Sequence, residues 1–294
     1  MKSYIVGTDW WTDCDDAVAM RILCRAHLAG KINVLGIGIN ACMEHSVTSL
    51  DGFLSLEGMP RIPIGIDLEA TDYSGKPPFQ LRLAAAAKHY TCNKDAQNAS
   101  TLYRRLLATC ETPIEIIEIG YPNVLATLLA SPPDHISPLT GRELVAQKVS
   151  KMWIMAGKWD VDGGIENNFA RGPRSRQAAV YLCEHCPVPI TFLGFEIGIH
   201  VITGGAILPK DHLYQAMCDH GSANGRHSWD PMLVVMALAG NEACAGYNTV
   251  TGTATVEAET GANHFHIDPT GKHKYVIKAK PDSYYISTIN DLIK

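Results

Sequence analysis

The chain has 294 residues, 46% of them hydrophobic, and a formal net charge of −5. This length and hydrophobic content suit one large α/β core, and the small negative charge gives no general attraction to nucleic acid or anionic membranes. The sequence has no run of eighteen apolar residues, and Met1-Lys2-Ser3 leads into a strand rather than into the apolar region of a signal peptide. We therefore expect a cytoplasmic protein with no nucleic-acid or membrane partner.

The nine cysteines are scattered and odd in number, which favours reduced thiols over a disulfide framework. The segment Cys183-Glu184-His185-Cys186 has the spacing of a metal or redox motif. It lacks a second Cys/His pair at the spacing of a structural zinc site. We interpret it as the end of a helix with incidental thiols.

Strand and helix patterns alternate along the chain. Apolar runs predict strands at 4–6, 32–37, 114–119, 151–155 and 190–193, the third despite its two glutamates. Helices are predicted at 17–23, 46–56, 100–110, 174–183, 212–218, 231–238 and 281–293. Two further strands, 249–257 and 274–277, are predicted to form a small hairpin-like addition around the turn Asp268-Pro269-Thr270-Gly271. This order predicts an α/β fold of one domain, residues 1–294, with a mostly parallel open sheet flanked by helices.

Four carboxylates lie within eight positions between the first strand and the first helix: Asp9, Asp13, Asp15 and Asp16. Like charges this close raise one another's pKa, and a divalent cation relieves the conflict. Carboxylate and carbonyl oxygens are the ligands that calcium and magnesium take. The carboxyl end of a strand in an open α/β sheet is also where ligands bind. The alternative, that Asp15 and Asp16 only cap the helix, would need one acidic residue rather than four.

Polar residues also follow the other predicted strands, namely Asn40, Asn123, Glu166, Asn168, Glu196 and His200, and Asp230 opens a predicted helix. Each could serve a local role, such as capping a helix or satisfying loop backbone groups. If the strands are parallel, however, all of these residues gather at one edge of the sheet. The repeated placement predicts that they line one pocket.

With these motifs the sequence resembles the inosine-uridine-preferring nucleoside hydrolases. Asp9-x5-Asp15-Asp16-Ala17 is similar to the N-terminal signature of that family, in a variant with two extra residues. The segments Gly120-Tyr121-Pro122-Asn123, Met155-Ala156-Gly157, Glu166-Asn167-Asn168-Phe169 and Trp229-Asp230-Pro231 follow in the family's order, so the resemblance spans about residues 3 to 240. It implies a Rossmann-like fold, a tightly bound calcium ion and hydrolysis of the N-glycosidic bond of a ribonucleoside.

The resemblance also implies roles for single residues. Asp9 resembles the general base, and Asp9, Asp16, Asp230 and the backbone carbonyl of Pro122 resemble the calcium ligands. Asp15, Glu166, Asn168 and Asn40 resemble the residues that hold the ribose. The expected partner is a small-molecule nucleoside or another riboside, and we expect a homodimer or homotetramer.

The chemistry agrees with these residue types. Cleavage of an N-ribosidic bond gives the sugar oxocarbenium character, which a carboxylate-lined pocket stabilises. Calcium can hold the ribose diol and lower the pKa of a bound water, whose proton Asp9 can take.

Two positions depart from the family pattern. Gly7 stands where the family often has an aspartate, two positions before the general base. Trp229 stands where many pyrimidine-accepting members have a histidine that protonates the leaving base. Trp229 or Trp10 could stack on a purine instead, with His227 as a nearby acid. We therefore expect a preference for purine ribosides or for substrates with good leaving groups.

Two other functions fit parts of the sequence. A metal-dependent phosphatase would need a cation for the phosphate, for which Lys158 is the one candidate, and no Gly-rich phosphate loop accompanies it. A non-catalytic sugar or nucleoside binder on the same scaffold would explain the missing histidine before Asp230.

Overall fold

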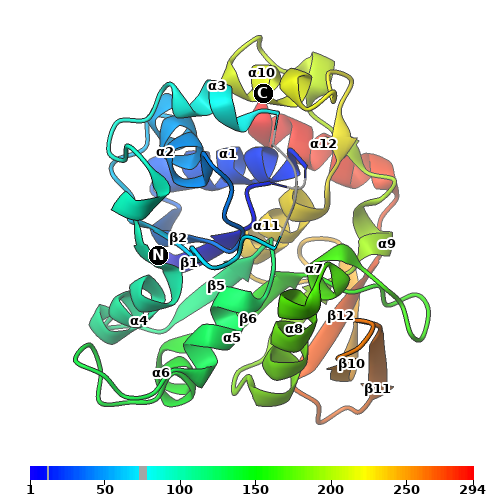
Figure 1. Ribbon diagram of the computed structural model, residues 1–294. Helices are drawn as coiled ribbons and strands as arrows, with labels where there is room; N and C mark the ends of the chain where they lie inside the picture. Colours follow the sequence, from blue (N-terminus) through cyan, green and yellow to red (C-terminus); the bar gives the residue numbers. More distant parts are fainter. Residues whose placement is uncertain (12, 73–77) are drawn as a thin grey trace.

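The computed structural model describes residues 1–11, 13–72 and 78–294, so that Thr12 of the acidic segment lies outside the described residues. Ten strands of the described chain form one sheet in the order β11-β10-β12-β7-β6-β5-β1-β2-β3-β4 (Figure 1). The strands from β12 to β4 run parallel, and β10 and β11 add an antiparallel edge. The strands are β1 (Lys2–Thr8), β2 (Ile32–Ile39), β3 (Ile64–Ile66), β4 (Gln97–Asn98), β5 (Ile114–Glu118), β6 (Val149–Met155), β7 (Ile190–Leu193), β10 (Tyr247–Val256), β11 (Asn263–Ile267) and β12 (His273–Lys278).

Helices cover both faces of this sheet (Figure 1). One face carries α1 (Asp15–Leu28), α2 (Ser46–Leu56), α11 (Trp229–Ala239) and α12 (Asp282–Ile293), and the other carries α4 (Ala99–Thr109), α5 (Asn123–Ala130), α6 (Gly141–Lys148) and α8 (Pro173–His185). Successive side chains of β1 point to opposite faces of the sheet. Tyr4 and Val6 therefore pack in the core with the first set of helices, and Ile5 packs in the core with the second set. Shorter elements complete the fold: α3 (Gln80–Ala84), α7 (Asn167–Ala170), α9 (Phe195–Gly198), α10 (His212–Asp219), β8 (Ile202–Thr203) and β9 (Arg226–His227).

The structure confirms the predicted fold class and corrects the C-terminal addition. The predicted strands correspond to β10 and β12, which do pair in antiparallel fashion. The turn at 268–271 instead joins β12 to β11, a strand that the sequence did not predict, and β10 lies between these two strands. The short strands β3 and β4 were also missed, because two or three residues carry no readable periodicity.

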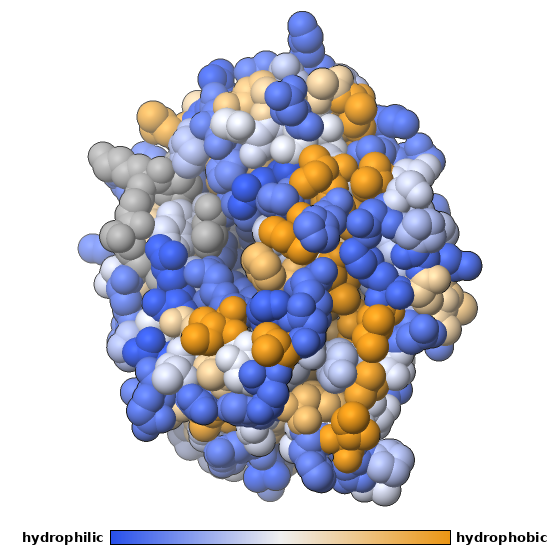
Figure 2. All heavy atoms as spheres, turned by 90° about the vertical axis from the view of Figure 1, so that its right-hand side faces the viewer, coloured by the Kyte–Doolittle hydropathy of each residue, from blue (hydrophilic) through white to orange (hydrophobic). Residues whose placement is uncertain are grey.

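Large hydrophobic side chains are exposed in several places. Figure 2 shows hydrophobic side chains as a band across the face that forms the right-hand side of Figure 1, where α9 lies. The large hydrophobic residues with exposed side chains include Val161 and Ile165, in the loop between β6 and α7, and Ile202 and Ile207. None of the helices in the described parts of the chain is long and apolar enough to cross a membrane.

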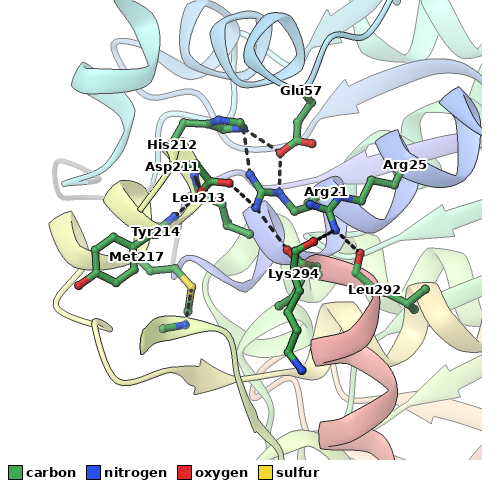
Figure 3. A network of polar contacts seen from close by, with 12 residues as sticks. Arg21, Arg25, Glu57, Asp211, His212, Leu213, Tyr214, Met217, Leu292 and Lys294 are labelled. Carbon is green, nitrogen blue, oxygen red and sulfur yellow. Dashed lines mark hydrogen bonds and ion pairs between the residues drawn. The ribbon is translucent and has the colours of Figure 1, made fainter. Parts of the chain in front are cut away.

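A buried group of charges, here called the Arg21 network, ties α1 to neighbouring elements (Figure 3). Arg21 is only 1% exposed, and it pairs with Glu57 at 2.6 Å and with Asp211 at 2.8 Å. His212 lies 2.7 Å from the same Glu57 oxygen. One turn further along α1, Arg25 donates to the backbone carbonyls of Leu292 and Lys294, both at 2.7 Å. The network thus fixes the ends of α2 and α12 and the start of α10 against α1.

Candidate active site

A cavity opens where the strand order of the sheet reverses. From β1 the chain continues to β2 and β3 on one side, whereas β5, β6 and β7 follow on the other. The carboxyl ends of strands at such a switch point form a crevice in which α/β proteins bind ligands. The lining includes the strand ends Ile119 and Met155, the carboxylates Asp9, Asp13, Asp15, Asp16, Glu166 and Asp230, and also Asn167, Asn168, Phe195, Arg226 and Trp229.

The loop after β1 holds two of the carboxylates by its own backbone. Trp10 adopts a left-handed conformation with φ 51°, which is strained for a residue with a side chain. This bend lets the Trp11 N–H donate to Asp9 at 2.9 Å. Asp16 accepts from the Trp10 N–H at 3.2 Å and from the Thr8 hydroxyl. Asp9 and Asp16 are therefore oriented by the loop before any ligand binds.

Two helix N-termini meet at the cavity. Asp15 and Asp16 open α1, Asp230 is the second residue of α11, and the Asp230 N–H donates to Asp15 at 3.1 Å. One carboxylate oxygen each from Asp15, Asp16 and Asp230 lies within 4.8 Å of the others. The positive ends of the two helix dipoles favour negative charge here, but they offset only part of the mutual repulsion.

The pKa values of three of these carboxylates are raised, first by burial and then by the charges of neighbouring carboxylates. Burial, followed by the charges of Asp13 and Asp230, raises the pKa of Asp15 well above its usual value. Burial and the charge of Asp9 raise the pKa of Asp16, and burial and the charge of Asp16 raise that of Asp230. Asp13 differs: despite burial, hydrogen bonds with Asp15 and Arg226 keep its pKa below the usual value. The Arg226–Asp13 pair, at 2.8 Å, thus compensates one carboxylate of the cluster.

Glu166 and Asn168 form another part of the wall. Glu166 is the N-cap of α7 and accepts from the backbone N–H groups of Gly157 at 3.0 Å and Asn168 at 2.7 Å. Burial nevertheless raises the pKa of Glu166 to about 7. The Asn168 side-chain amide donates to the Met155 carbonyl at 2.9 Å. The structure therefore places Glu166 and Asn168, two of the four residues predicted to hold the ribose, in the cavity lining with the acidic cluster.

Trp229 and Phe195 form an aromatic part of the cavity lining. The rings of Trp229 and Phe195 stack with centroids 5.3 Å apart, and the Trp229 indole donates to the Phe195 carbonyl at 2.6 Å. The guanidinium carbon of Arg226 lies 5.9 Å from the centroid of the Trp229 ring. The sequence pointed to Trp229 but not to Phe195 or Arg226.

Trp10 takes no part in this surface. It is fully buried, its indole donates to Ser49 at 2.8 Å, and its ring packs against Phe53 and Phe79. Trp10 is thus a core residue, and the suggestion that it stacks on a base is not supported.

Three other predicted site residues are not among the described residues that line the cavity. Asn40 is buried, with its amide bound at both ends, to Glu118 at 2.8 Å and to the Tyr121 N–H at 2.9 Å. Pro122 is the N-cap of α5, and its carbonyl accepts from Ala126 at 2.9 Å. His227 lies beside Trp229, with ring centroids 5.3 Å apart.

Lys158, the cation that a phosphatase would need, also lies apart from the cavity lining. Its ammonium group pairs with Asp160 instead. Arg226 is the one cationic side chain that lines the cavity within the described chain. Its signal in the sequence was weak, because its partner Asp13 lies 213 positions away.

The donor set fits a hard divalent cation. Three buried carboxylates converge within 4.8 Å, and burial together with the charges of neighbouring carboxylates raises their pKa values. Oxygen donors of this kind suit calcium or magnesium, whereas zinc sites are usually built with His or Cys ligands. The cluster is therefore a candidate metal centre.

Comparisons with known proteins agree with this architecture. No protein-family model and no curated protein matches the chain. Among solved structures, the inosine-uridine preferring nucleoside hydrolase from Bacillus anthracis aligns with a TM-score of 0.71 and 14% identity, covering 100% of this chain and 99% of the other. The purine-preferring ribonucleoside hydrolase from Gardnerella vaginalis gives 0.71 and 15%, with 100% and 99% coverage. The type III effector protein XopQ, solved with adenosine diphosphate ribose, gives 0.71 and 14%, with 100% and 93% coverage. Over its full length, then, this chain has the fold of the nucleoside hydrolases.

Proposed function

We propose that this protein hydrolyses the N-glycosidic bond of ribonucleosides to ribose and free base in a calcium-dependent reaction. The observation that carries the proposal is the convergence of Asp15, Asp16 and Asp230 within 4.8 Å in a cavity at the switch point of this fold. A cluster of buried carboxylates with raised pKa values is costly to maintain, and perturbed groups of this kind gather at functional sites.

The proposed calcium ligands are Asp9, Asp16, Asp230 and the main-chain carbonyl of Pro122. Asp9 lines the same cavity as Asp16 and Asp230, and its negative charge contributes to the raised pKa of both. The Pro122 carbonyl uses one lone pair for Ala126, and a carbonyl oxygen has two. Asp15, whose carboxylate also accepts from the Asp230 N–H, is assigned to the sugar hydroxyls.

Different side chains of the cavity are proposed to act on the attacking water and on the ribose. A bound calcium ion would neutralise the cluster and supply Lewis acidity at the sugar hydroxyls and the attacking water. Asp9, oriented by the Trp11 N–H, takes the proton of that water, and general base catalysis of this kind contributes about 10²–10⁴ in rate. Asp15, Glu166 and Asn168 hold the ribose, and the carboxylates stabilise the positive charge that develops on it.

The base is proposed to stack on Trp229, whose ring is fixed by Phe195. Stacking on an aromatic side chain contributes about 1–3 kcal/mol per base in nucleic-acid binders. We therefore propose a preference for purine ribosides, with His227 as the acid for the leaving base. Trp229→Ala should lower kcat/KM on inosine by about one to two decades, at roughly 1.4 kcal/mol per decade.

The His227 proposal has its own test. His227→Ala should lower kcat on inosine more than on a nitrophenyl riboside, whose leaving group needs no proton. Equal losses on the two substrates would remove His227 as the acid. Faster cleavage of uridine than of inosine by the unmodified protein would contradict the purine preference.

The deciding experiment is a panel of purine and pyrimidine ribosides, followed by release of free base with and without a calcium chelator. We expect turnover that chelation abolishes and added calcium restores. A purified protein that contains no divalent ion, and that added calcium neither binds to nor activates, would contradict the calcium proposal.

The second candidate is a non-catalytic ribose or nucleoside binder. It is supported by the similarity to XopQ, which was solved with adenosine diphosphate ribose, and by Arg226, a cation in the cavity that suits an anionic ligand. Tight binding of ribose or adenosine diphosphate ribose without turnover across the riboside panel would favour this function.

We further propose a cytoplasmic homodimer or homotetramer. The exposed side chains of Val161 and Ile165, and the hydrophobic band in Figure 2, support an interface between copies of the chain. Light scattering coupled to size-exclusion chromatography gives the mass directly, and a monomer at micromolar concentration would contradict the proposal.

A further inference from the structure

Glu118, the last residue of β5, is fully buried and directly precedes Ile119 of the cavity lining. One carboxylate oxygen, Oε1, accepts from the Asn40 side chain at 2.8 Å and from the Gly120 N–H at 3.0 Å. The other, Oε2, is buried and has no hydrogen-bond partner within the described chain. A buried carboxylate oxygen without a hydrogen-bond partner destabilises the fold. This cost indicates that Glu118 has a functional role.

The neighbouring strands are shaped to make room for this carboxyl group. Gly7 of β1 pairs with Glu118 on one side and with Gly38 of β2 on the other. A Cβ atom at Gly7 would overlap with the Glu118 carboxyl group, and one at Gly38 would overlap with the phenol of Tyr103. The Tyr103 hydroxyl is fixed in turn by the Val6 carbonyl at 3.1 Å. Gly7 thus leaves the space that the carboxyl group occupies, and Gly38 leaves the space that the Tyr103 phenol occupies.

The two hydrogen bonds that Glu118 Oε1 accepts fix the position of the turn at 120–122. Asn40, held by Glu118, accepts from the Tyr121 N–H at 2.9 Å, and its own carbonyl accepts from Asn123 at 3.1 Å. Between these contacts, Gly120 approaches the backbone so closely that a Cβ atom there would overlap with the Asp9 N–H. Glu118 and Asn40 together therefore press the turn at 120–122 against the residue proposed as the general base.

We propose that Glu118 is a positioning residue, whose carboxyl group holds Asn40 and the turn at 120–122 so that Asp9 and the Pro122 carbonyl share one ion. This inference rests on the proposed function. It requires a hydrogen-bond acceptor for Asn40 and Gly120 at this place in the interior rather than a glutamate at this place in the sequence. An aspartate at position 7 would put its carboxyl group into the same space once Glu118 is shortened.

The test moves the carboxyl group from one strand to the next. Glu118→Ala should lower kcat and calcium affinity about 10- to 100-fold, the loss usual for groups that orient metal ligands, with a smaller change in KM. The double variant Gly7→Asp/Glu118→Ala should recover at least tenfold of both losses. Gly7→Asp alone should be destabilised by overlap with Glu118. Glu115→Ala, which removes the other glutamate of β5, is the matched control and should leave both quantities unchanged.

A conservative variant covers the case in which Glu118→Ala does not fold. Glu118→Gln keeps an acceptor for Asn40 and Gly120, so it should retain kcat and calcium affinity within about threefold of the unmodified protein. A folded double variant that recovers nothing, a Glu118→Ala variant with unchanged kcat and calcium affinity, or a Glu118→Gln variant as impaired as Glu118→Ala would overturn the inference. Calcium affinity by titration calorimetry is read without a nucleoside. If the unmodified protein cleaves no riboside, the proposed function fails, and calorimetry still decides the role of Glu118.

Discussion

Helix α1 contributes to two buried clusters of ionisable groups that are built in opposite ways. Its first residues, Asp15 and Asp16, belong to the acidic cluster of the cavity, and Arg21 begins the Arg21 network about 8–9 Å further along the helix. In the network, Arg21 faces two carboxylates, Glu57 and Asp211. In the cavity, Arg226 is the one cation of the described lining against six carboxylates.

The pKa shifts of the two clusters have opposite signs, apart from that of Asp13, whose pKa hydrogen bonds with Asp15 and Arg226 keep low. Burial alone would raise the pKa of Glu57, but the hydrogen bond from His212 and the charge of Arg21 keep it below its usual value. For Asp16 and Asp230, burial and neighbouring charges act in the same direction and raise the pKa. The charges of the network therefore stabilise the fold as it stands. Those of the cavity destabilise the metal-free protein, and the proposed calcium ion would relieve this repulsion.

The largest expected effect is on activity, from Asp16→Asn. The variant should lose calcium binding and at least about 10²–10³-fold in kcat, because one member of the converging carboxylates is neutralised. An asparagine oxygen can still accept from Thr8 and from the Trp10 N–H. The metal-free variant should therefore be more stable than the metal-free parent, by about 1 kcal/mol. Calcium titration calorimetry, steady-state kinetics and thermal unfolding in a chelator measure these three quantities.

Asp291→Asn, at an exposed position of α12, is the control for this experiment. It should change neither calcium binding nor the stability of the metal-free protein. If Asp16→Asn lowers the stability in the chelator, the carboxylates of the cavity do not repel one another enough to destabilise the fold. The proposed difference between this cluster and the Arg21 network would then be wrong.

Arg21→Met should lower the stability of the fold and leave activity and calcium binding unchanged. Removing one partner from a buried ion pair leaves the other charge uncompensated and typically costs about 3–5 kcal/mol of folding free energy. The folded fraction should keep the kcat and calcium affinity of the parent, because Arg21 is not part of the cavity lining. Arg25→Met, one turn further along the helix, removes two hydrogen bonds to carbonyls rather than an ion pair, and should cost about 1–3 kcal/mol. Urea unfolding in the presence of calcium compares the variants.

The sequence predicted the parallel sheet well, because five of its strands are apolar runs separated by helical stretches. It missed β3, β4 and β11, which are short or lie at the edge of the sheet, where pairing rather than periodicity defines a strand. The acidic segment could be interpreted because four carboxylates in eight positions exceed what helix capping needs.

Other site residues were hidden by distance along the chain. Arg226 becomes meaningful only when folding brings it to Asp13, and Phe195 only when it stacks on Trp229. Glu118 was visible only as a polar exception in an isoleucine-rich strand. Its place became clear with the pairing of Gly7 and Gly38, which depends on the register of three strands. Asn40 was expected at the sugar, whereas its bonds to Glu118 and Tyr121 favour a part in the scaffold.

The smallest expected effect, and the most direct measure of the contrast, is the dependence of stability on pH. A carboxyl group whose pKa is raised by folding binds its proton more tightly in the folded state, so its contribution to stability is complete below its unfolded pKa of about 4 and is lost as the pH rises through the folded pKa. Asp15, Asp16 and Asp230 act in this way, as do Glu166, with its pKa raised to about 7, and Glu118, raised to about 8. In a chelator, Tm should therefore fall between pH 5 and pH 8.

Glu57 and Asp211 have lowered pKa values, so their contribution is present above pH about 4 and is lost only in more acidic solution. The two clusters thus act in separate pH windows. Saturating calcium should flatten the slope between pH 5 and pH 8, because the ion replaces the protons that relieve the repulsion. Arg21→Met should keep that slope in the chelator, whereas Asp16→Asn should reduce it by removing one titrating group. Each kcal/mol corresponds to about 2–4 °C in a chain near this size. A Tm in chelator that rises steadily from pH 5 to pH 8 would show that the cavity carboxylates are already compensated in the metal-free protein.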